Sequence, residues 1–204
     1  MSPVRLLIAT KNRGKVVEIR ALLGLALLKN VEVATLADVP DVEQPREDGK
    51  TFAENARIKA LHYARAHKVL CVADDSGLSV DALGGMPGVH SARFAGEGAN
   101  DAQNNARLLR DLQPFPHPWK ASFVCAAAAA LPGRVIVEAT GTMPGEILPE
   151  PRGREGFGYD PIFLVDSLGK TLAELPVEAK NRISHRGQAM RALIGEMKAA
   201  GILG

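Results

Sequence analysis

The stretch Val72-Ala73-Asp74-Asp75-Ser76-Gly77-Leu78 joins an apolar run to two adjacent carboxylates. Residues 69–73 are all apolar, which predicts a buried strand that stops at Asp74. Ligands commonly bind where the strands of a sheet end. Two carboxylates there suit a hard cation such as Mg2+, or one of them can act as a base toward water. Because successive strand side chains point to opposite faces, we expect only one of Asp74 and Asp75 to face any given cleft.

The same stretch has a second interpretation, a turn. Asp, Ser and Gly favour turns because their short side chains hydrogen-bond to nearby backbone and glycine accepts unusual dihedral angles. Taken alone, the sequence fits a turn as well as a site. The rest of the chain has to decide between the two.

Working outward, apolar runs and amphipathic segments alternate along the chain, which predicts an α/β fold. An apolar pair of runs around Pro132-Gly133 predicts a hairpin, and the Gly- and Pro-rich residues 144–156 predict a loop. The predicted strands are residues 4–9, 31–35, 69–73, 120–131, 135–143 and 162–165, and the predicted helices are residues 15–26, 51–68, 100–112, 176–180 and 188–200.

The bulk composition indicates a globular protein and excludes several other classes. The 204 residues carry a net charge of +2, so nothing in the overall charge points to nucleic acid or a membrane surface. Cys71 and Cys125 lie in apolar runs without paired Cys or His spacing, which predicts buried free thiols and no zinc site. The longest apolar run, residues 123–131, is too short to span a bilayer, and no leader pattern is recognised. We therefore expect one domain over residues 1–204 and a cytoplasmic location.

The loop Thr10-Lys11-Asn12-Arg13-Gly14-Lys15 follows the first predicted strand and opens a helix. A helix N-terminus presents unpaired N–H groups and a positive dipole end, and this one adds three cationic side chains, so it predicts a phosphate site. It is not a Walker loop, because Ala9 and Val16 stand where that pattern needs glycine and Ser or Thr. The alternative is an ordinary strand-to-helix turn with solvated lysines.

Two acidic residues near the next helix have different explanations. Thr51 and Glu54 fit a capping box, which accounts for Glu54. Glu47 precedes the cap and has no such explanation, so it is either solvated or a second metal carboxylate.

Two further clusters lie in the last third of the chain. Phe157 stands between glycines in Gly156-Phe157-Gly158-Tyr159-Asp160-Pro161, where it is either a stacking surface for a planar ligand or a core aromatic at a bend. Lys180 ends a short helical segment, and Ser184-His185-Arg186-Gly187 precedes the last helix. A single His at such a place is usually a capping or surface residue.

Together these motifs indicate a metal-dependent enzyme that acts on a nucleoside polyphosphate. Cations at a helix start, carboxylates for one divalent ion and a stackable aromatic occur in one chain, without a Ser-His-Asp set or a dinucleotide glycine pattern.

In this order, the motifs resemble the inosine triphosphate pyrophosphatase family, and the resemblance covers nearly the whole chain. Its segments are Ala9 to Lys15 with Glu18, Thr51 to Ala56, Ala73 to Leu78 running on to Ser91-Ala92-Arg93, Phe157 to Pro161, and Ser184 to Gly187. The resemblance implies an elongated mixed sheet in two lobes flanked by helices, with the active site in the cleft between the lobes. It also implies a homodimer and Mg2+-dependent hydrolysis of dITP, ITP and XTP or dXTP to the monophosphate and pyrophosphate.

The resemblance also assigns the site residues. Asp75 and Lys15 are expected to be catalytic, and Glu47 and Asp75 are expected to bind the metal. The expected substrate contacts are Thr10, Lys11, Asn12, Arg13, Gly14 and Lys15 for the triphosphate, Ser76, and Phe157, Gly158, Tyr159, Asp160, Lys180, His185 and Arg186 for the base. Two other hypotheses remain open: a pyrophosphatase tuned to another base, and a nucleotide-binding sensor without catalysis.

Overall fold

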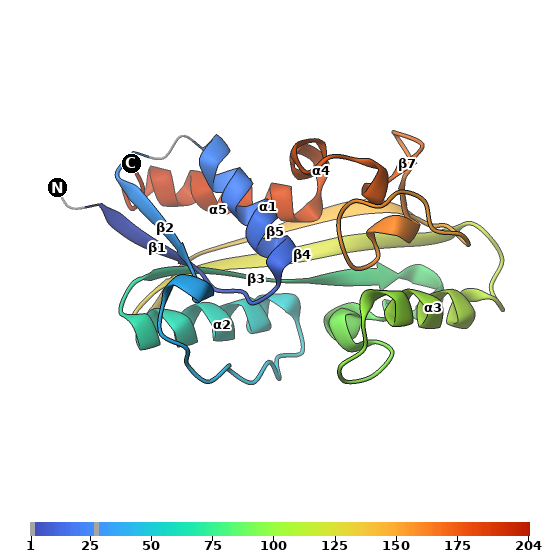
Figure 1. Ribbon diagram of the computed structural model, residues 1–204, viewed down its shortest axis with the longest axis horizontal. Helices are drawn as coiled ribbons and strands as arrows, with labels where there is room; N and C mark the ends of the chain where they lie inside the picture. The colour runs from blue at the N-terminus through green and yellow to red at the C-terminus, as the bar shows by residue number, and fades with distance from the viewer. Residues whose placement is uncertain (1–2, 27–28) are drawn as a thin grey trace. The chain divides into compact units, whose positions relative to one another are not determined.

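The computed structural model describes residues 3–26 and 29–204, so four residues of the predicted domain 1–204 lie outside it. Figure 1 shows a sheet flanked by helices. The seven strands are hydrogen-bonded in the order β2-β1-β3-β4-β5-β6-β7. The strands are β1 (Val4–Ile8), β2 (Val31–Thr35), β3 (Leu70–Val80), β4 (Trp119–Leu131), β5 (Arg134–Ile147), β6 (Phe163–Val165) and β7 (Lys170–Thr171). The helices are α1 (Arg13–Leu25), α2 (Phe52–His67), α3 (Asp101–Leu112), α4 (Val177–Ile183) and α5 (His185–Ala199).

The sheet is mixed, which confirms the predicted α/β class. β1 pairs in parallel with both β2 and β3, with Val4 opposite Val31 and Leu6 opposite Leu70. β5 pairs antiparallel with β6, and β6 pairs antiparallel with β7. β4 and β5 are neighbours joined by a two-residue turn, and Gly133 there has a φ of +98°, which confirms the predicted hairpin.

The chain divides into two compact units. The first unit comprises residues 1–75, 125–141 and 185–204, and the second comprises residues 76–124 and 142–184. Each unit has its own hydrophobic clusters, so each is described by itself.

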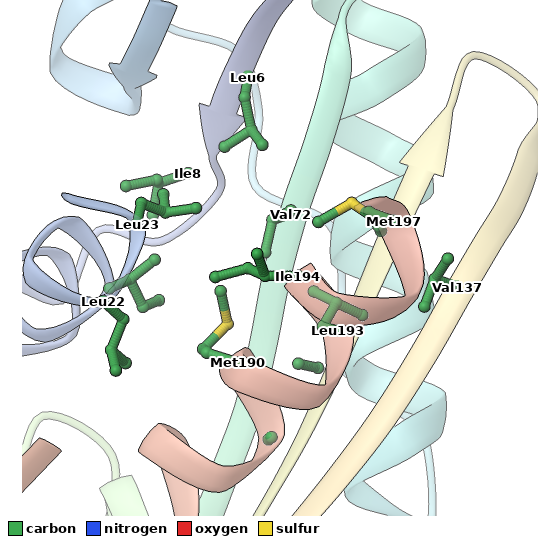
Figure 2. Close-up of a cluster of buried hydrophobic side chains, with 14 of the residues drawn as sticks. Leu6, Ile8, Leu22, Leu23, Val72, Val137, Met190, Leu193, Ile194 and Met197 are labelled. Carbon is green, nitrogen blue, oxygen red and sulfur yellow. The ribbon is translucent and has the colours of Figure 1, made fainter. Parts of the chain in front are cut away.

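In the first unit, β1 buries side chains on both of its faces. Leu6 and Ile8 pack in one cluster with α1 and α5, and Leu7 and Ala9 pack in another with α2. This two-residue period explains why the strand reads as a continuous apolar run, as strands covered on both faces do. Figure 2 shows the cluster beside α5, where Val72, Ile194 and Met190 lie close together.

The second unit is built around a single cluster. Leu108 and Leu112 of α3 pack with Leu78 of β3 and with Phe123 and Phe163, whose rings lie 4.6 Å apart. This packing gives α3 its apolar face and leaves its polar residues to contact neighbouring loops.

Four predicted boundaries are wrong, and one of them is the end of α4, which lies at Ile183 and not at Lys180. β3 does not stop at Asp74 but continues to Val80, so the stretch Asp74 to Gly77 is strand and the turn interpretation is excluded. β5 runs on to Ile147 through residues predicted as loop. The last helix begins at His185, not near Gln188.

Both cysteines are buried and free, as predicted. No helix formed by residues 3–26 or 29–204 is both long and apolar enough to cross a membrane.

Candidate active site

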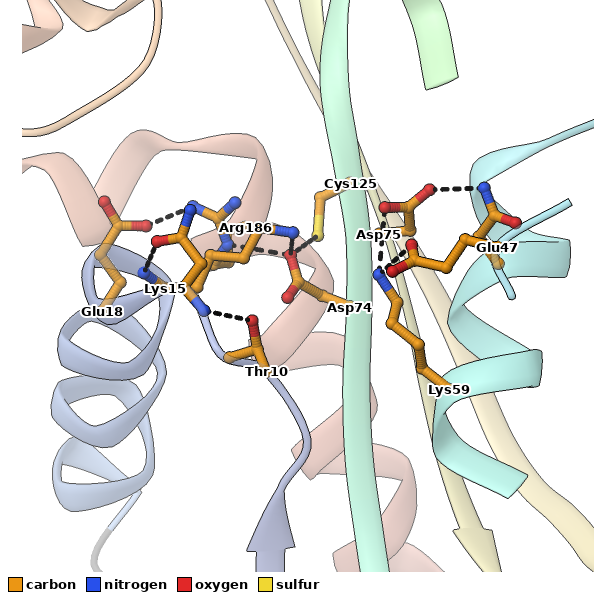
Figure 3. Close-up of polar contacts among 11 residues, drawn as sticks. Thr10, Lys15, Glu18, Glu47, Lys59, Asp74, Asp75, Cys125 and Arg186 are labelled. Atoms are coloured by element: carbon orange, nitrogen blue, oxygen red, sulfur yellow. Dashed lines mark hydrogen bonds and ion pairs between the residues drawn. The ribbon is translucent and has the colours of Figure 1, made fainter. Parts of the chain in front are cut away.

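The two adjacent carboxylates of β3 project to opposite faces of the strand, as the alternation rule predicts. Figure 3 shows Asp74 on the side of α1 and Asp75 on the side of α2. Asp74 is completely buried, whereas Asp75 is half-buried. The pair therefore serves two separate clusters of the first unit.

The first cluster surrounds Asp74, which lies between two cations. Its Oδ2 is 3.0 Å from Lys15 Nζ and accepts a hydrogen bond from Arg186 Nε at 3.1 Å. Arg186 also forms a buried ion pair with Glu18 of α1. Burial alone would raise the pKa of Asp74, but the charges of Lys15 and Arg186 outweigh it and hold the pKa well below its usual value. Burial would lower the pKa of the Arg186 guanidinium, but the charges of Asp74 and Glu18 outweigh this effect and raise the pKa.

The second cluster surrounds Asp75. Lys59 of α2 places Nζ 2.8 Å from Glu47 Oε2 and 3.2 Å from Asp75 Oδ1. Asn55, one helical turn before Lys59, donates to the other Asp75 oxygen at 3.1 Å. Burial would lower the pKa of Lys59, but the charges of Asp75, Asp74 and Glu47 raise it, so this side chain is a cation at neutral pH.

Glu47 and Asp75 converge on one ammonium nitrogen, so their oxygens lie close enough to share one cation. Within the described residues, no group of three or more His, Cys, Asp or Glu side chains could hold a metal. Mg2+ needs no such group, because it is usually bound by one or two carboxylates together with substrate phosphates and water. The donor set therefore fits Mg2+.

The loop Thr10 to Lys15 forms the start of α1, as predicted. Asn12 caps the helix, and its side chain accepts from the N–H of Lys15 at 3.1 Å. Thr10 Oγ1 accepts from the N–H of Asn12, and exposed Lys11 pairs with Asp41 at 3.1 Å. The N–H groups of Arg13 and Gly14 remain at the positive end of the helix, where an anion can bind.

Three further predicted substrate residues, Phe157, Asp160 and Lys180, lie together in the second unit. Lys180 is buried and its Nζ lies 2.5 Å from Asp160 Oδ2 and 4.8 Å from the centre of the Phe157 ring. Asp160 Oδ2 also accepts from the N–H of Phe157 at 2.8 Å. The three residues thus form one cluster in which a cation lies over an aromatic face.

Of the remaining predicted residues, some belong to the first unit and some to the second. Tyr159 is buried and its hydroxyl donates to the carbonyl of Ser91, while Ser76 is half-buried in β3. His185 lies in the first turn of α5 and is only 3% exposed, so the alternative that it is a surface residue is wrong. Arg186, expected beside the base, contacts Glu18 and Asp74 in the first unit.

Sequence reasoning did not assign a site role to Lys59, Asn55 or Glu18, and it named Asp74 only together with Asp75, as one of two candidate carboxylates. A signal for two of them was present, because Asn55 and Lys59 are spaced one turn apart beside the core positions Ala56 and Ala60. Polar residues on such a face are informative because burying them requires partners.

The Ham1 family model matches residues 6–196. A dITP/XTP pyrophosphatase of Geobacillus kaustophilus is 52% identical over 189 residues, which is 92% of this chain and 91% of that protein. A dITP/XTP pyrophosphatase of Geobacter sulfurreducens is 48% identical over 97% of this chain and 98% of its own length.

Solved structures of similar proteins have the same fold as this chain. The structure of a HAM1 protein from Coxiella burnetii has a TM-score of 0.83 and 39% identity, and the match covers 96% of this chain and 99% of that one. A nucleoside-triphosphatase / dITP/XTP pyrophosphatase from Mycobacterium abscessus gives a TM-score of 0.73 and 43% identity, over 93% of this chain and 97% of that one. These matches confirm the resemblance seen in the motifs, and the chain belongs to the Ham1 family.

Proposed function

We propose that this protein hydrolyses the non-standard purine nucleoside triphosphates dITP, ITP, XTP and dXTP to the monophosphate and pyrophosphate, with Mg2+ as cofactor. The observation that carries the proposal is the 52% identity, over 92% of the chain, to a relative named dITP/XTP pyrophosphatase. The reaction would remove these nucleotides from the pool. We further propose that residues 1–204 act as one domain, as a homodimer in the cytoplasm.

The start of α1 binds the triphosphate. The N–H groups of Arg13 and Gly14 and the side chains of the loop Thr10 to Lys15 offer donors and positive charge to phosphate oxygens. Lys15 carries charge that balances the negative charge developing on the leaving pyrophosphate. Asp74 and Arg186 hold Lys15 in place, because Asp74 Oδ2 contacts both cations.

Asp75 handles the attacking water. Glu47 and Asp75 would hold Mg2+, which would supply positive charge to the phosphate oxygens. Asp75 orients the water or accepts its proton as the water attacks the α-phosphorus. Asn55 and Lys59 fix the carboxylate through one oxygen each, so it cannot rotate away.

The second unit recognises the base. Phe157 stacks on the purine, with Gly158 and Tyr159 forming the adjoining backbone, and Asp160 holds Lys180. The Lys180 ammonium is a donor only. Hypoxanthine and xanthine carry an acceptor at position 6, whereas adenine carries a donor there, so adenine sets its amino group against the Lys180 ammonium and cannot accept from it. Such mismatches discriminate by up to about 10⁴-fold in favourable sites. His185 and Ser76 complete the substrate contacts.

The assignment of Asp75 is tested with Asp75→Asn, which keeps the shape of the side chain and removes its charge. We expect dITP hydrolysis to fall by about 10²- to 10⁴-fold, because the variant neither binds the metal as a carboxylate nor accepts a proton. The matched control is Asp81→Asn, at an exposed carboxylate a few residues along, which should retain wild-type turnover.

Direct binding separates catalysis from sensing. Calorimetry with dITP and Mg2+ should detect binding in both proteins, weaker in Asp75→Asn. An Asp75→Asn protein that hydrolyses dITP at the wild-type rate contradicts the assignment. A wild-type protein that binds dITP tightly without releasing pyrophosphate contradicts the enzyme and supports the sensor.

A further inference from the structure

The polar side of α3 holds the backbone of the loop that contains Phe157. Asp101 and Asn105 are spaced one helical turn apart and so lie on the same side of α3. The N–H of Gly158 donates to Asp101 Oδ2 at 2.6 Å. Asn105 Nδ2 donates to the carbonyl oxygen of Gly158 at 3.1 Å.

These two hydrogen bonds fix both peptide groups that flank the Gly158 Cα atom. Its N–H belongs to the peptide shared with Phe157, and its carbonyl belongs to the peptide shared with Tyr159. Gly158 has a φ of +64°, and a Cβ atom there would meet nothing within 4 Å. Glycine populates positive and negative φ about equally, so neither the residue nor crowding at its Cα holds this conformation. The two contacts from α3 hold it, together with the hydrogen bond within the loop from the N–H of Asp160 to the carbonyl oxygen of Phe157 at 3.3 Å.

The orientation of Gly158 determines the position of its neighbours. The N–H of Phe157 donates to Asp160, which pairs with Lys180, and Lys180 lies over the Phe157 ring. A rotation at Gly158 would move Phe157 relative to Lys180, whereas Tyr159 is separately held by Ser91.

The bond to Asp101 is the stronger of the two. A carboxylate acceptor forms a shorter and stronger hydrogen bond than a neutral one. Asp101 also stands in the first turn of α3, where the positive helix end stabilises its charge.

We infer that Asp101 and Asn105 are positioning residues for base recognition, which set the affinity and selectivity for the purine by fixing Gly158. They do not touch the substrate in this account. The inference rests on the proposed function, because it assumes that Phe157 and Lys180 contact the base.

The central test is Asp101→Ala, with Asp101→Asn as the conservative variant that keeps an acceptor oxygen. Losing one charged hydrogen bond to the loop should raise the KM for dITP about tenfold and leave kcat within about twofold. The ratio of kcat/KM for dITP over dATP should fall by about tenfold. Asp101→Asn should recover most of both losses, and Asn105→Ala should change KM and selectivity in the same direction but by less, because it removes the weaker hydrogen bond.

The matched control is Gln103→Ala. Gln103 lies in the same turn of α3, where its side chain accepts from the N–H of Asn100, and no hydrogen bond joins it to Gly158 in the described chain. The Gln103→Ala substitution removes a capping hydrogen bond of α3 but keeps both hydrogen bonds to Gly158, so KM and selectivity should stay at wild-type values. Amide hydrogen exchange should show faster exchange at Gly158 in Asp101→Ala and not in Gln103→Ala.

Calorimetry with dITP in the presence of a chelator separates this inference from the proposed function. If the wild type binds dITP and Asp101→Ala binds about tenfold more weakly, positioning is supported even when no hydrolysis is detected. Unchanged affinity, KM and selectivity in Asp101→Ala would overturn the inference while leaving the hydrolase intact. Equal losses in Gln103→Ala would also overturn it, and a wild type that neither binds nor hydrolyses dITP overturns both.

Discussion

Arg186 is the residue on which the interior polar cluster of the first unit depends. It is 2% exposed and bonds to Glu18 and Asp74 from two other elements. A buried guanidinium is tolerated only because carboxylates compensate it. Its contacts hold the start of α5 to α1 and β3, and through Asp74 they orient Lys15.

Removing one charge from this cluster should therefore be costly. We expect Glu18→Gln to lower the free energy of unfolding by about 3 kcal/mol, the cost of leaving a buried charge partly uncompensated. Urea denaturation measures the loss. The control is Glu32→Gln, whose carboxylate lies 3.8 Å from Arg5 in an exposed pair and should change stability by less than about 1 kcal/mol. Equal effects of the two substitutions would contradict this view of Arg186.

The two thiols allow a second prediction at the residue scale. Burial raises the pKa of both Cys71 and Cys125 far above the usual thiol value, and the nearby charge of Asp74 adds to the shift at Cys125. Only the thiolate reacts, so a disulfide reagent at pH 8 should modify neither thiol in the folded protein and both in urea. Raising the pH to 9.5 should leave the folded protein unmodified, and rapid labelling at pH 8 would contradict the burial.

At the scale of elements, β5 and α5 of the first unit approach each other closely. A Cβ atom on Gly141 would lie 2.1 Å from the carbonyl oxygen of His185 and 2.7 Å from the N–H nitrogen of Ala189. Backbone atoms cannot move aside as a flexible side chain can. Gly141 thus lets the start of α5 reach the strand.

Gly141→Ala should therefore lower the free energy of unfolding by more than about 3 kcal/mol, because the helix must shift. Gly195→Ala is the matched control, since Gly195 lies within α5 and a Cβ atom there meets nothing within 4 Å. It should stabilise the protein by about 0.5–1 kcal/mol through helix propensity. Thermal unfolding measures both, and a Gly141→Ala protein as stable as the wild type would contradict the close approach.

The same elements show how far the sequence predicts the fold. Apolar runs and helical patterns located the five α-helices of the described residues and the longer strands, because those patterns follow directly from which faces are buried. The end of β3 was predicted wrongly because Asp74 and Asp75 looked like a break. Their partners Lys15, Lys59 and Arg186 come from three helices distant in sequence, so local chemistry could not show that charged residues would continue the strand.

The predicted end of β5 is wrong for a related reason. Pro144 and Gly145 signal a loop, yet Gly145 is a strand residue whose missing side chain makes room for Phe163 and the carbonyl of Leu164 on the neighbouring strand. For the site, sequence found the residues that carry recognisable motifs. It did not find Asn55 and Lys59, whose role appears only when α2 is placed beside Asp75.

On the scale of the whole molecule, the candidate residues divide by task. The residues proposed to bind phosphate and metal, Lys15, Glu47 and Asp75, belong to the first unit, and those proposed to bind the base, Phe157 and Lys180, belong to the second. Each group is held by its own internal contacts. We therefore expect substitutions in the second unit to change which base is accepted, and substitutions in the first to change the rate for every substrate.

The proposed homodimer is a separate prediction at this scale. Sedimentation equilibrium at micromolar concentration should give one species of twice the 21.7 kDa chain mass. A single species of the chain mass across that range would contradict it.

The most direct test of the central claim is pyrophosphate release from dITP, dATP, dGTP and dTTP, each measured with Mg2+ and with a chelator. We expect fast release from dITP that the chelator abolishes, and weak release from the three standard nucleotides. Equal release from all four nucleotides would contradict base selection by Phe157 and Lys180. It would not contradict the proposed roles of the phosphate-binding and metal-binding residues. Absence of release from dITP, with Mg2+ present, would contradict the proposed function itself.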